Sequence, residues 1–152
     1  MSVRRAEKKD VKTLVELGKL MHKESVYAKY DFDEQYILHY GEHMVENPDN
    51  FGVFLAEDKE GEVTALVAGF INQMYFNPDV KIAYDFLLYV HPEKRGGMSA
   101  VRVMRAYEKW AKEVGACEIS MGITAGIDDE KAHNFYRGLG YEPKGSYLNK
   151  EL

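Results

Sequence analysis

A glycine pair between a strand-like segment and a helix-like segment is the first feature of this sequence that could bind a ligand. Residues 90–100 read VHPEKRGGMSA, so Gly96 and Gly97 directly precede a helical pattern. Free N–H groups at a helix start bind phosphate oxygens, and glycine lets the backbone approach a ligand without a Cβ in the way. Nearby positive charge comes from Lys94, Arg95 and Arg102. The segment predicts an anion-binding turn, although a purely structural turn would also use a glycine pair.

Two segments together resemble the GNAT (Gcn5-related) N-acetyltransferases. The family's cofactor signature is a strand, Val-x-Pro-Glu, x-Arg-Gly and then spaced small residues that open a helix, which residues 90–100 follow. The family usually has a glycine where this chain has Met98, whereas Ala100 fits the last position. Residues 134–141, NFYRGLGY, resemble the late motif, an Asn-x-Tyr followed by Leu-Gly-Tyr or Leu-Gly-Phe. The predicted element order also agrees, so the resemblance covers nearly the whole chain.

The resemblance implies an acetyl-coenzyme A-dependent N-acetyltransferase that moves the acetyl group to a primary amine by direct attack in a ternary complex. The backbone of Leu88, Tyr89 and Val90 would then hold the thioester carbonyl and the pantetheine amides, and Asn134 would bind the pantetheine arm. The pyrophosphate would lie on a turn made of Lys94, Arg95, Gly96, Gly97, Met98, Ser99 and Ala100. The acceptor would be a small-molecule amine or an amine of a peptide or protein. Family members are often dimers, so a homodimer is one expectation.

Two side chains are candidates for acid–base chemistry. In the family, a tyrosine at the position of Tyr136 commonly protonates the departing thiolate, and charge that builds up on sulfur would make a hydrogen bond there useful. Asp85 lies inside an apolar strand-like segment, where an acid is unusual unless it is paired or functional, and the family often takes its base from this strand. The structural alternatives are packing for Tyr136 and an ion pair with Lys or Arg for Asp85.

The segment between residues 26 and 40 could form one side of an acceptor site. It combines acidic side chains with five aromatic ones, those of Tyr27, Tyr30, Phe32, Tyr36 and Tyr40. Aromatic faces attract cations, and this part of the chain matches the acceptor-side helices of the family. Ordinary core packing would use the same residues.

A competing motif predicts metal chemistry. His39, Glu42 and His43 fit H-x-x-E-H, the inverted zinc-protease pattern, in which two histidines bind Zn²⁺ and the glutamate acts as a base. Gly41 within the helix, the lack of a third ligand and the short chain argue against it, so we expect no metal site. A third reading is a non-catalytic module that binds coenzyme A or other partners on the same fold.

The elements that must position these residues follow from periodicity. Helical spacing predicts helices over residues 10–22, 33–45 and 97–114, and a fourth that begins at Asp128 or Asp129 and stops at Gly140. Strands are expected at residues 2–5, 51–56, 63–74, 81–90, 117–123 and 141–148, with a break at residues 77–79. The order predicts one α/β domain over residues 1–152, with a mixed central sheet and helices on both faces.

Composition restricts the class of protein further. Hydrophobic residues make up 45% and charged residues 30% of the 152 residues, a balance typical of globular proteins. A net charge of -5 disfavours nucleic acid and anionic membrane surfaces as partners. The chain has one cysteine, Cys117, no signal-peptide pattern and no apolar run as long as a membrane span. We therefore expect a cytoplasmic protein.

Overall fold

The centre of the molecule is a five-stranded sheet, in a computed structural model that describes residues 1–152. The strands lie in the order β1-β2-β3-β4-β5, and their bounds are β1 Ser2–Arg5, β2 Phe51–Glu57, β3 Val63–Met74, β4 Asn77–Val90 and β5 Glu118–Ser120. Strands β1 to β4 pair antiparallel, whereas β5 runs parallel to β4. The predicted mixed sheet is confirmed.

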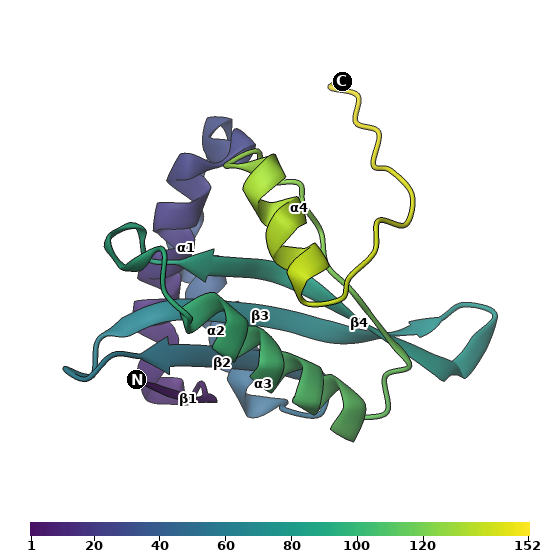
Figure 1. Cartoon of the computed structure of the whole chain (residues 1–152), viewed down its shortest axis with the longest axis horizontal. Coiled ribbons are helices and arrows are strands. Elements are labelled where there is room, and N and C mark those ends of the chain that lie inside the picture. The colour runs from purple at the N-terminus through teal and green to yellow at the C-terminus, as the bar shows by residue number, and fades with distance from the viewer.

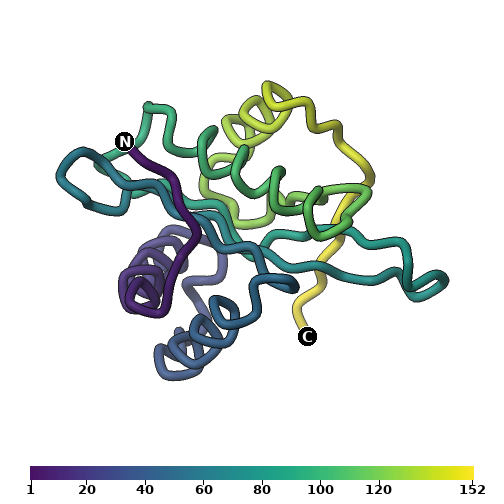
Figure 2. Tube along the Cα trace, turned by 90° about the horizontal axis from the view of Figure 1, so that it is seen from below, coloured from purple at the N-terminus to yellow at the C-terminus, as the bar shows by residue number.

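Helices cover both faces of this sheet, as predicted. Helices α1 (Val11–Glu24) and α2 (Glu34–Glu46) lie on one face, and α3 (Ser99–Glu113) and α4 (Asp129–Gly138) lie on the other (Figure 1 and Figure 2). Short 3-10 turns join some of them: η1 Lys8–Asp10, η2 Val26–Lys29 and η3 Pro92–Lys94. None of the helices has the length and apolarity needed to cross a membrane.

The alternating direction of side chains along the strands divides the hydrophobic core into two layers. On β2, Phe54 packs in the cluster that contains Tyr107 and Trp110 of α3, whereas Leu55 packs in the cluster that contains Leu17 of α1. Successive strand residues point to opposite faces, so one strand supplies both layers. Because both faces are buried, β2 and β3 read as nearly continuous apolar runs.

Aspartates begin two of the helices, as the sequence indicates. The side chain of Asp33 accepts the Tyr36 N–H at 3.0 Å at the start of α2. Asp128 accepts the Lys131 N–H at 3.1 Å, which makes Asp128 rather than Asp129 the N-cap of α4. Each carboxylate satisfies a backbone donor that has no partner inside its helix.

A β-bulge distorts β4 next to Asp85. Ala68 of β3 pairs with Leu87 and Gly69 pairs with Asp85, so Phe86 is an extra residue without a partner. The Tyr107 hydroxyl donates a 2.6 Å hydrogen bond to the carbonyl of Tyr84 at the same place. A bulge bends its strand and changes the direction of neighbouring side chains. The strand carrying Asp85 is therefore shaped by contacts from β3 and α3.

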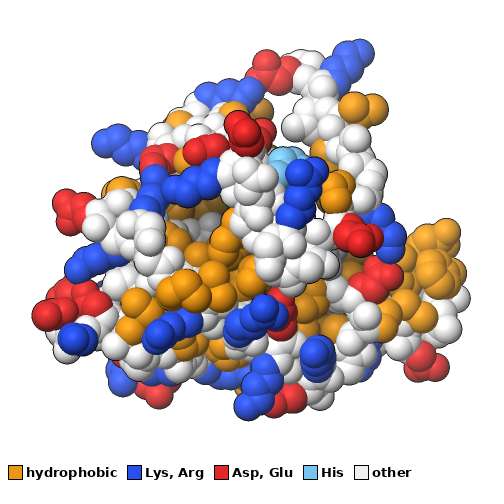
Figure 3. Space-filling model, in the orientation of Figure 1, with side chains coloured by type: hydrophobic (Ala, Val, Ile, Leu, Met, Phe, Trp, Pro, Cys, Tyr) orange, Lys and Arg blue, Asp and Glu red, His pale blue; other side chains and the backbone are white.

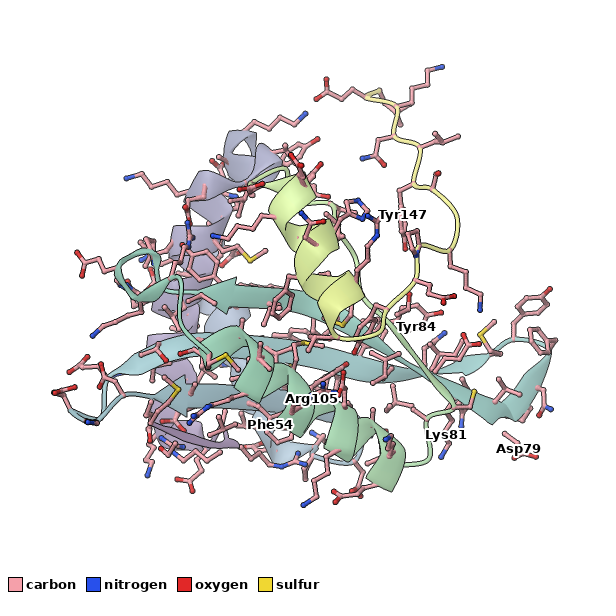
Figure 4. The ribbon with its side chains drawn as sticks, in the orientation of Figure 1. Phe54, Asp79, Lys81, Tyr84, Arg105 and Tyr147 are labelled. Atoms are coloured by element: carbon pink, nitrogen blue, oxygen red, sulfur yellow. The ribbon has the colours of Figure 1, made fainter.

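The predicted strand over residues 141–148 is wrong, because the C-terminal segment contains no strand. It runs apart from the sheet in Figure 1, and Tyr147, labelled in Figure 4, is 81% exposed. Pro143 cannot donate to a ladder, and Gly145 has a φ of +94°, which is not a strand conformation. The segment is attached through single contacts instead, such as Tyr141 to Glu108 at 3.2 Å.

The boundaries of β4 and β5 also differ from the predicted ones. Residues 77–79 do not break the chain, since β4 begins at Asn77 and the turn lies at Tyr75 and Phe76. Pro78 is tolerated because residues 78–80 have no partner in the β3–β4 register; Asp79 and Lys81 near this end of β4 are labelled in Figure 4. At the other side of the sheet, β5 ends at Ser120 rather than at residue 123. Because β5 ends early, the last part of β4 has no partner strand on that side.

Candidate active site

A cleft forms where β4 and β5 separate. Their pairing runs from Ile82 opposite Glu118 to Tyr84 opposite Ser120 and then stops, although β4 continues to Val90. The Gly122 N–H donates to Asp85 Oδ1 at 2.8 Å, so a side chain takes the donor that could have continued the ladder. Ligands of open α/β sheets bind beyond the carboxyl ends of parallel strands, which is where this cleft lies.

The cleft contains a cavity of about 430 Å³ with mostly hydrophobic walls. Residues 85–90 of β4 form one wall, and residues 122–129 with the inner face of α4 form the other. The turn at residues 95–97 and the start of α3 close one end, and Met21 of α1 contributes from the opposite face of the sheet. Figure 3 shows apolar side chains gathered around a hollow beside α4. Size and apolarity are typical of small-molecule sites.

The predicted anion-binding turn is at one end of this cavity. Gly96 has a φ of +93°, a left-handed conformation that favours glycine, and a Cβ at Gly96 or Gly97 would meet no atom within 4 Å. Helix α3 begins at Ser99 and Met98 provides no side-chain cap, so the first N–H groups of the helix have no partner one turn earlier. The open space and free donors fit a pyrophosphate.

The cations of the turn are paired with carboxylates, contrary to the expectation that their charge is free for the ligand. Lys94 Nζ lies 2.8 Å from Asp58 Oδ2, and Lys94 does not line the cavity. Arg95 donates to both carboxylate oxygens of Glu24, at 3.1 and 2.8 Å, and this pairing lowers the pKa of Glu24. The backbone N–H groups at the start of α3 are therefore donors that remain available to an anion when Lys94 and Arg95 are paired.

Tyr136 points from α4 into the cavity and is only 8% exposed. The hydroxyls of Tyr107 and Tyr141 bond to Tyr84 and Glu108, whereas that of Tyr136 has no partner within the chain. Burial, followed by the nearby charge of Asp85, raises the pKa of Tyr136 above its ordinary value. The phenol therefore stays protonated at working pH and is available as a hydrogen-bond donor.

Asp85 faces the same cavity from β4. Its partner is the Gly122 N–H rather than the Lys or Arg side chain of the structural alternative. Burial raises the pKa of Asp85, and the hydrogen bond from Gly122 opposes that rise only in part. A half-buried carboxylate with a raised pKa in a cleft is a candidate general base.

Replacement of Asp85 by asparagine is expected to stabilise the fold at neutral pH while lowering activity. A carboxyl whose pKa is raised by folding contributes stability below its ordinary pKa and loses that contribution as pH rises through the folded pKa. Above its folded pKa the wild-type protein therefore carries a half-buried charge that the variant lacks. Thermal unfolding should show a higher Tm for Asp85→Asn at pH 7.5 and a smaller difference near pH 4, about the ordinary carboxyl pKa. An equal difference at both pH values would contradict the assignment of a raised pKa.

The other predicted site residues divide into two groups. Leu88, Tyr89, Val90, Gly97 and Ala100 line the cavity beside Arg95 and Gly96.

Three more predicted residues, besides Lys94, lie outside the cavity. Ser99 is buried and bonds to the Thr64 hydroxyl at 2.9 Å, which attaches the start of α3 to β3. Met98 is 53% exposed, and Asn134 is exposed on the outer face of α4. Neither lines the cavity, so a role for Asn134 on the pantetheine arm stays a prediction.

The second wall of the cleft, formed by residues 122–129, was not predicted from the sequence. A signal was present, because Gly122, Gly126 and Asp128 are turn-forming residues directly after a strand that is parallel to its neighbour. Phe86 was also missed. It lines the cavity at the bulge, where it has no partner on β3, and no sequence pattern indicated the bulge.

Part of the expected aromatic wall lies next to the cavity. Tyr40 of α2 stacks on Tyr36, with ring centroids 6.0 Å apart, and meets the edge of Phe86 at 5.8 Å. Phe86 in turn lies 4.7 Å from Phe70. Tyr40 therefore connects α2 to a cavity-lining ring, while Tyr36 is 62% exposed.

The residues of the zinc-like motif make other contacts on α2. His43 lies against the rings of Tyr40 and Phe51, and its Nδ1 is 3.3 Å from the amide of Asn47. Glu42 is 3.9 Å from Lys8. No group of three or more His, Cys, Asp or Glu side chains in the molecule could hold a metal ion.

Comparison with known proteins agrees with this geometry. A family model described as the acetyltransferase (GNAT) family matches residues 15–141. No significant match was found among curated proteins. Two solved structures are an aminoglycoside acetyltransferase from an uncultured soil metagenomic sample (18% identity, TM-score 0.75) and glucosamine-6-phosphate N-acetyltransferase from Arabidopsis thaliana (16%, 0.76). Each match covers 99% of this chain and 97% of the other.

A third structure is described as a predicted acetyltransferase with acetyl-CoA from Clostridium acetobutylicum. It is 18% identical, with a TM-score of 0.75, and the match covers 99% of this chain and 95% of that one. At these identities the three structures support the fold alone. The family model spans most of the chain, and both motifs, residues 90–100 and 134–141, lie inside the matched region. The chain therefore belongs to the GNAT family of acetyltransferases and is an acyltransferase.

Proposed function

We propose that this acyltransferase is an acetyl-CoA-dependent N-acetyltransferase that acts on a primary amine by direct attack in a ternary complex. The observation that carries the proposal is the cleft between β4 and β5, which has an anion-binding turn at one end and Asp85 with Tyr136 further along. Asp85 and Val90 are five residue steps apart along the strand, a span of about 17 Å. A ligand that reaches both ends must be long and must carry its anion at one end.

The donor would be held by the backbone along β4. Beyond Tyr84 this strand has no partner on the β5 side, so the N–H and C=O groups of that edge are available to an extended amide chain. Gly96, Gly97 and the first turn of α3 would hold the pyrophosphate. When bound, acetyl-CoA supplies a thioester carbonyl as the electrophile.

Asp85 and Tyr136 would divide the proton transfers. A lysine-like amine with a pKa of about 10.4 is neutral in only about one molecule in 10³ at pH 7, so a base is needed. Asp85 would accept that proton, directly or through water, as the amine nitrogen forms its bond to the carbonyl carbon. Tyr136 would donate a hydrogen bond to the sulfur as the C–S bond breaks.

For the acceptor, the proposal specifies only that it carries a primary amine. The aminoglycoside and glucosamine-6-phosphate acetyltransferases differ in acceptor although they share this fold, so the fold does not identify it. Around this cavity, Phe86 and Tyr40 offer aromatic surface and Asp85 and Asp128 offer negative charge. Those groups suit a cationic amine on a small molecule or peptide.

The test is thiol release from acetyl-CoA in the presence of polyamines, aminoglycosides, amino acids or peptides with free N-termini. We expect release with at least one class of amine and a matching gain of one acetyl group in the product by mass spectrometry. Binding of acetyl-CoA without thiol release for any amine would contradict the proposed acceptor class. Failure to bind acetyl-CoA would contradict the proposed donor.

A further inference from the structure

Residues 24–26, which we call the clasp, join the two walls of the cleft. They lie between the end of α1 and the start of η2, on the opposite face of the sheet from α3 and α4. Neither Glu24 nor Val26 lines the cavity. The clasp nevertheless contacts the turn on one wall and residues 125–126 on the other.

Glu24 forms the contacts with the first wall. Both of its carboxylate oxygens accept from Arg95, and the Tyr89 hydroxyl donates to the same carboxylate. Arg95 Nε donates to the Val90 carbonyl at 3.2 Å, and the guanidinium lies 5.4 Å from the centre of the Tyr89 ring. Each nitrogen of the Arg95 head group therefore donates one hydrogen bond within the protein, which fixes the turn relative to β4.

Val26 forms the contacts with the second wall. Its N–H donates to the Ala125 carbonyl at 2.9 Å. Its side chain fills the space beside Gly126, where a Cβ would lie 2.4 Å from Val26 Cγ1. Between them, the Ser25 hydroxyl donates to the His22 carbonyl at 2.9 Å and accepts the Tyr27 N–H at 3.2 Å, which holds the chain as it leaves α1.

We propose that the clasp sets the width of the cleft, and that Glu24 is a positioning residue that holds Arg95 and the cofactor turn in the binding conformation. The inference rests on the proposed function, because it assigns coenzyme A to this cleft. Two separated strand ends have no ladder between them to fix their distance, and the clasp supplies the missing connection. A site that is held in its bound geometry binds more tightly, because less order must be imposed on binding.

The first experiment measures coenzyme A binding to Glu24→Gln by calorimetry. The amide keeps the size of the side chain but loses the charge that pairs with Arg95, so we expect Kd for coenzyme A to rise about tenfold. In steady-state assays KM for acetyl-CoA should rise while kcat stays within about twofold, a division that a general loss of folded protein would not produce. Glu34→Gln is the matched control, because Glu34 pairs with Lys19 at 2.9 Å outside the cavity, and its Kd should equal that of the wild type.

The second experiment disturbs the other wall. Gly126→Ala places a methyl group against Val26 and should raise Kd for coenzyme A at least tenfold. The pair Val26→Ala with Gly126→Ala restores the space, so part of the lost affinity should return although the φ of +69° remains unfavourable for alanine. Unfolding of each ligand-free variant is measured beside binding to confirm that it is folded.

The outcomes separate the clasp from the proposed function. If the wild-type protein does not bind coenzyme A, the proposed function fails. If the wild type binds but Glu24→Gln keeps its Kd within twofold, the clasp is overturned. Tighter binding by Glu24→Gln would also overturn it, because it would mean that a released Arg95 contacts the pyrophosphate better than a held one.

Discussion

Replacement of Tyr136 by phenylalanine is expected to lower kcat about 100-fold, within the range that general acids contribute, with little change in KM for acetyl-CoA. The hydroxyl points into the cavity without a partner in the chain, and the raised pKa keeps it protonated. Phenylalanine keeps the ring contacts with Phe135 and Tyr141 and removes only the donor. Steady-state kinetics with saturating amine would measure the effect on both constants.

Tyr141→Phe is the matched control for this experiment. Its hydroxyl bonds to Glu108 at 3.2 Å and Tyr141 does not line the cavity, so kcat should remain within about twofold of the wild type. An unchanged kcat in Tyr136→Phe would remove the acid role and leave Tyr136 as a packing residue. Equal losses in both variants would indicate a structural effect on α4 instead.

Replacement of Gly69 by alanine is expected to destabilise the fold by about 3 kcal/mol or more, at the upper end of the cost of overpacking. A Cβ at Gly69 would lie 2.1 Å from the Tyr107 hydroxyl and 2.1 Å from the Tyr84 carbonyl oxygen. One of these atoms belongs to the backbone of β4, so no rotamer change relieves the overlap. Chemical denaturation measures the free energy of unfolding, with the midpoint shifted and the slope preserved.

Two further variants identify the cause of that loss. Gly138→Ala adds a methyl group at a helical site with no atom within 4 Å, so it should be neutral or slightly stabilising. Tyr107→Phe combined with Gly69→Ala removes the overlap with the hydroxyl but leaves those with the Tyr84 carbonyl oxygen and with the ring carbon Cζ, which is 2.8 Å away, so it should restore only part of the stability. Full restoration would show that the backbone of β4 adapts to the new side chain. Asp85 directly follows Tyr84, so a shift of the Tyr84 backbone also moves the Asp85 carboxylate. The folded fraction of Gly69→Ala should therefore also lose activity.

The sequence by itself determined the fold class and the location of the glycine turn before α3. Apolar periodicity of 3.6 in the helices and 2 in the strands decides which faces are buried, and these are local properties of the chain. Gly96 and Gly97 before a helix indicated an anion site, and the structure places them at open space with free N–H groups. Agreement with residues 134–141 identified the family, which the family model confirms.

Local patterns failed where long-range contacts compete with them. Residues 141–148 alternate enough to suggest a strand, but Pro143 and Gly145 cannot form one without a neighbouring ladder to compensate. Residues 121–123 have strand composition, yet the Asp85 carboxylate takes the Gly122 N–H and the ladder stops. A side chain 37 positions away in the sequence therefore decides where β5 ends.

Only the tertiary structure decided what the charged and aromatic groups of the site do. Lys94 and Arg95 looked like free cations, but they pair with Asp58 and Glu24, which are distant in sequence. Phe86 lines the cavity at a one-residue bulge of β4 that the local sequence does not indicate. Periodicity describes which face a residue occupies within its own element. The partner of a charge and the width of a cleft depend on which other elements the fold brings beside it, and no local pattern contains that information.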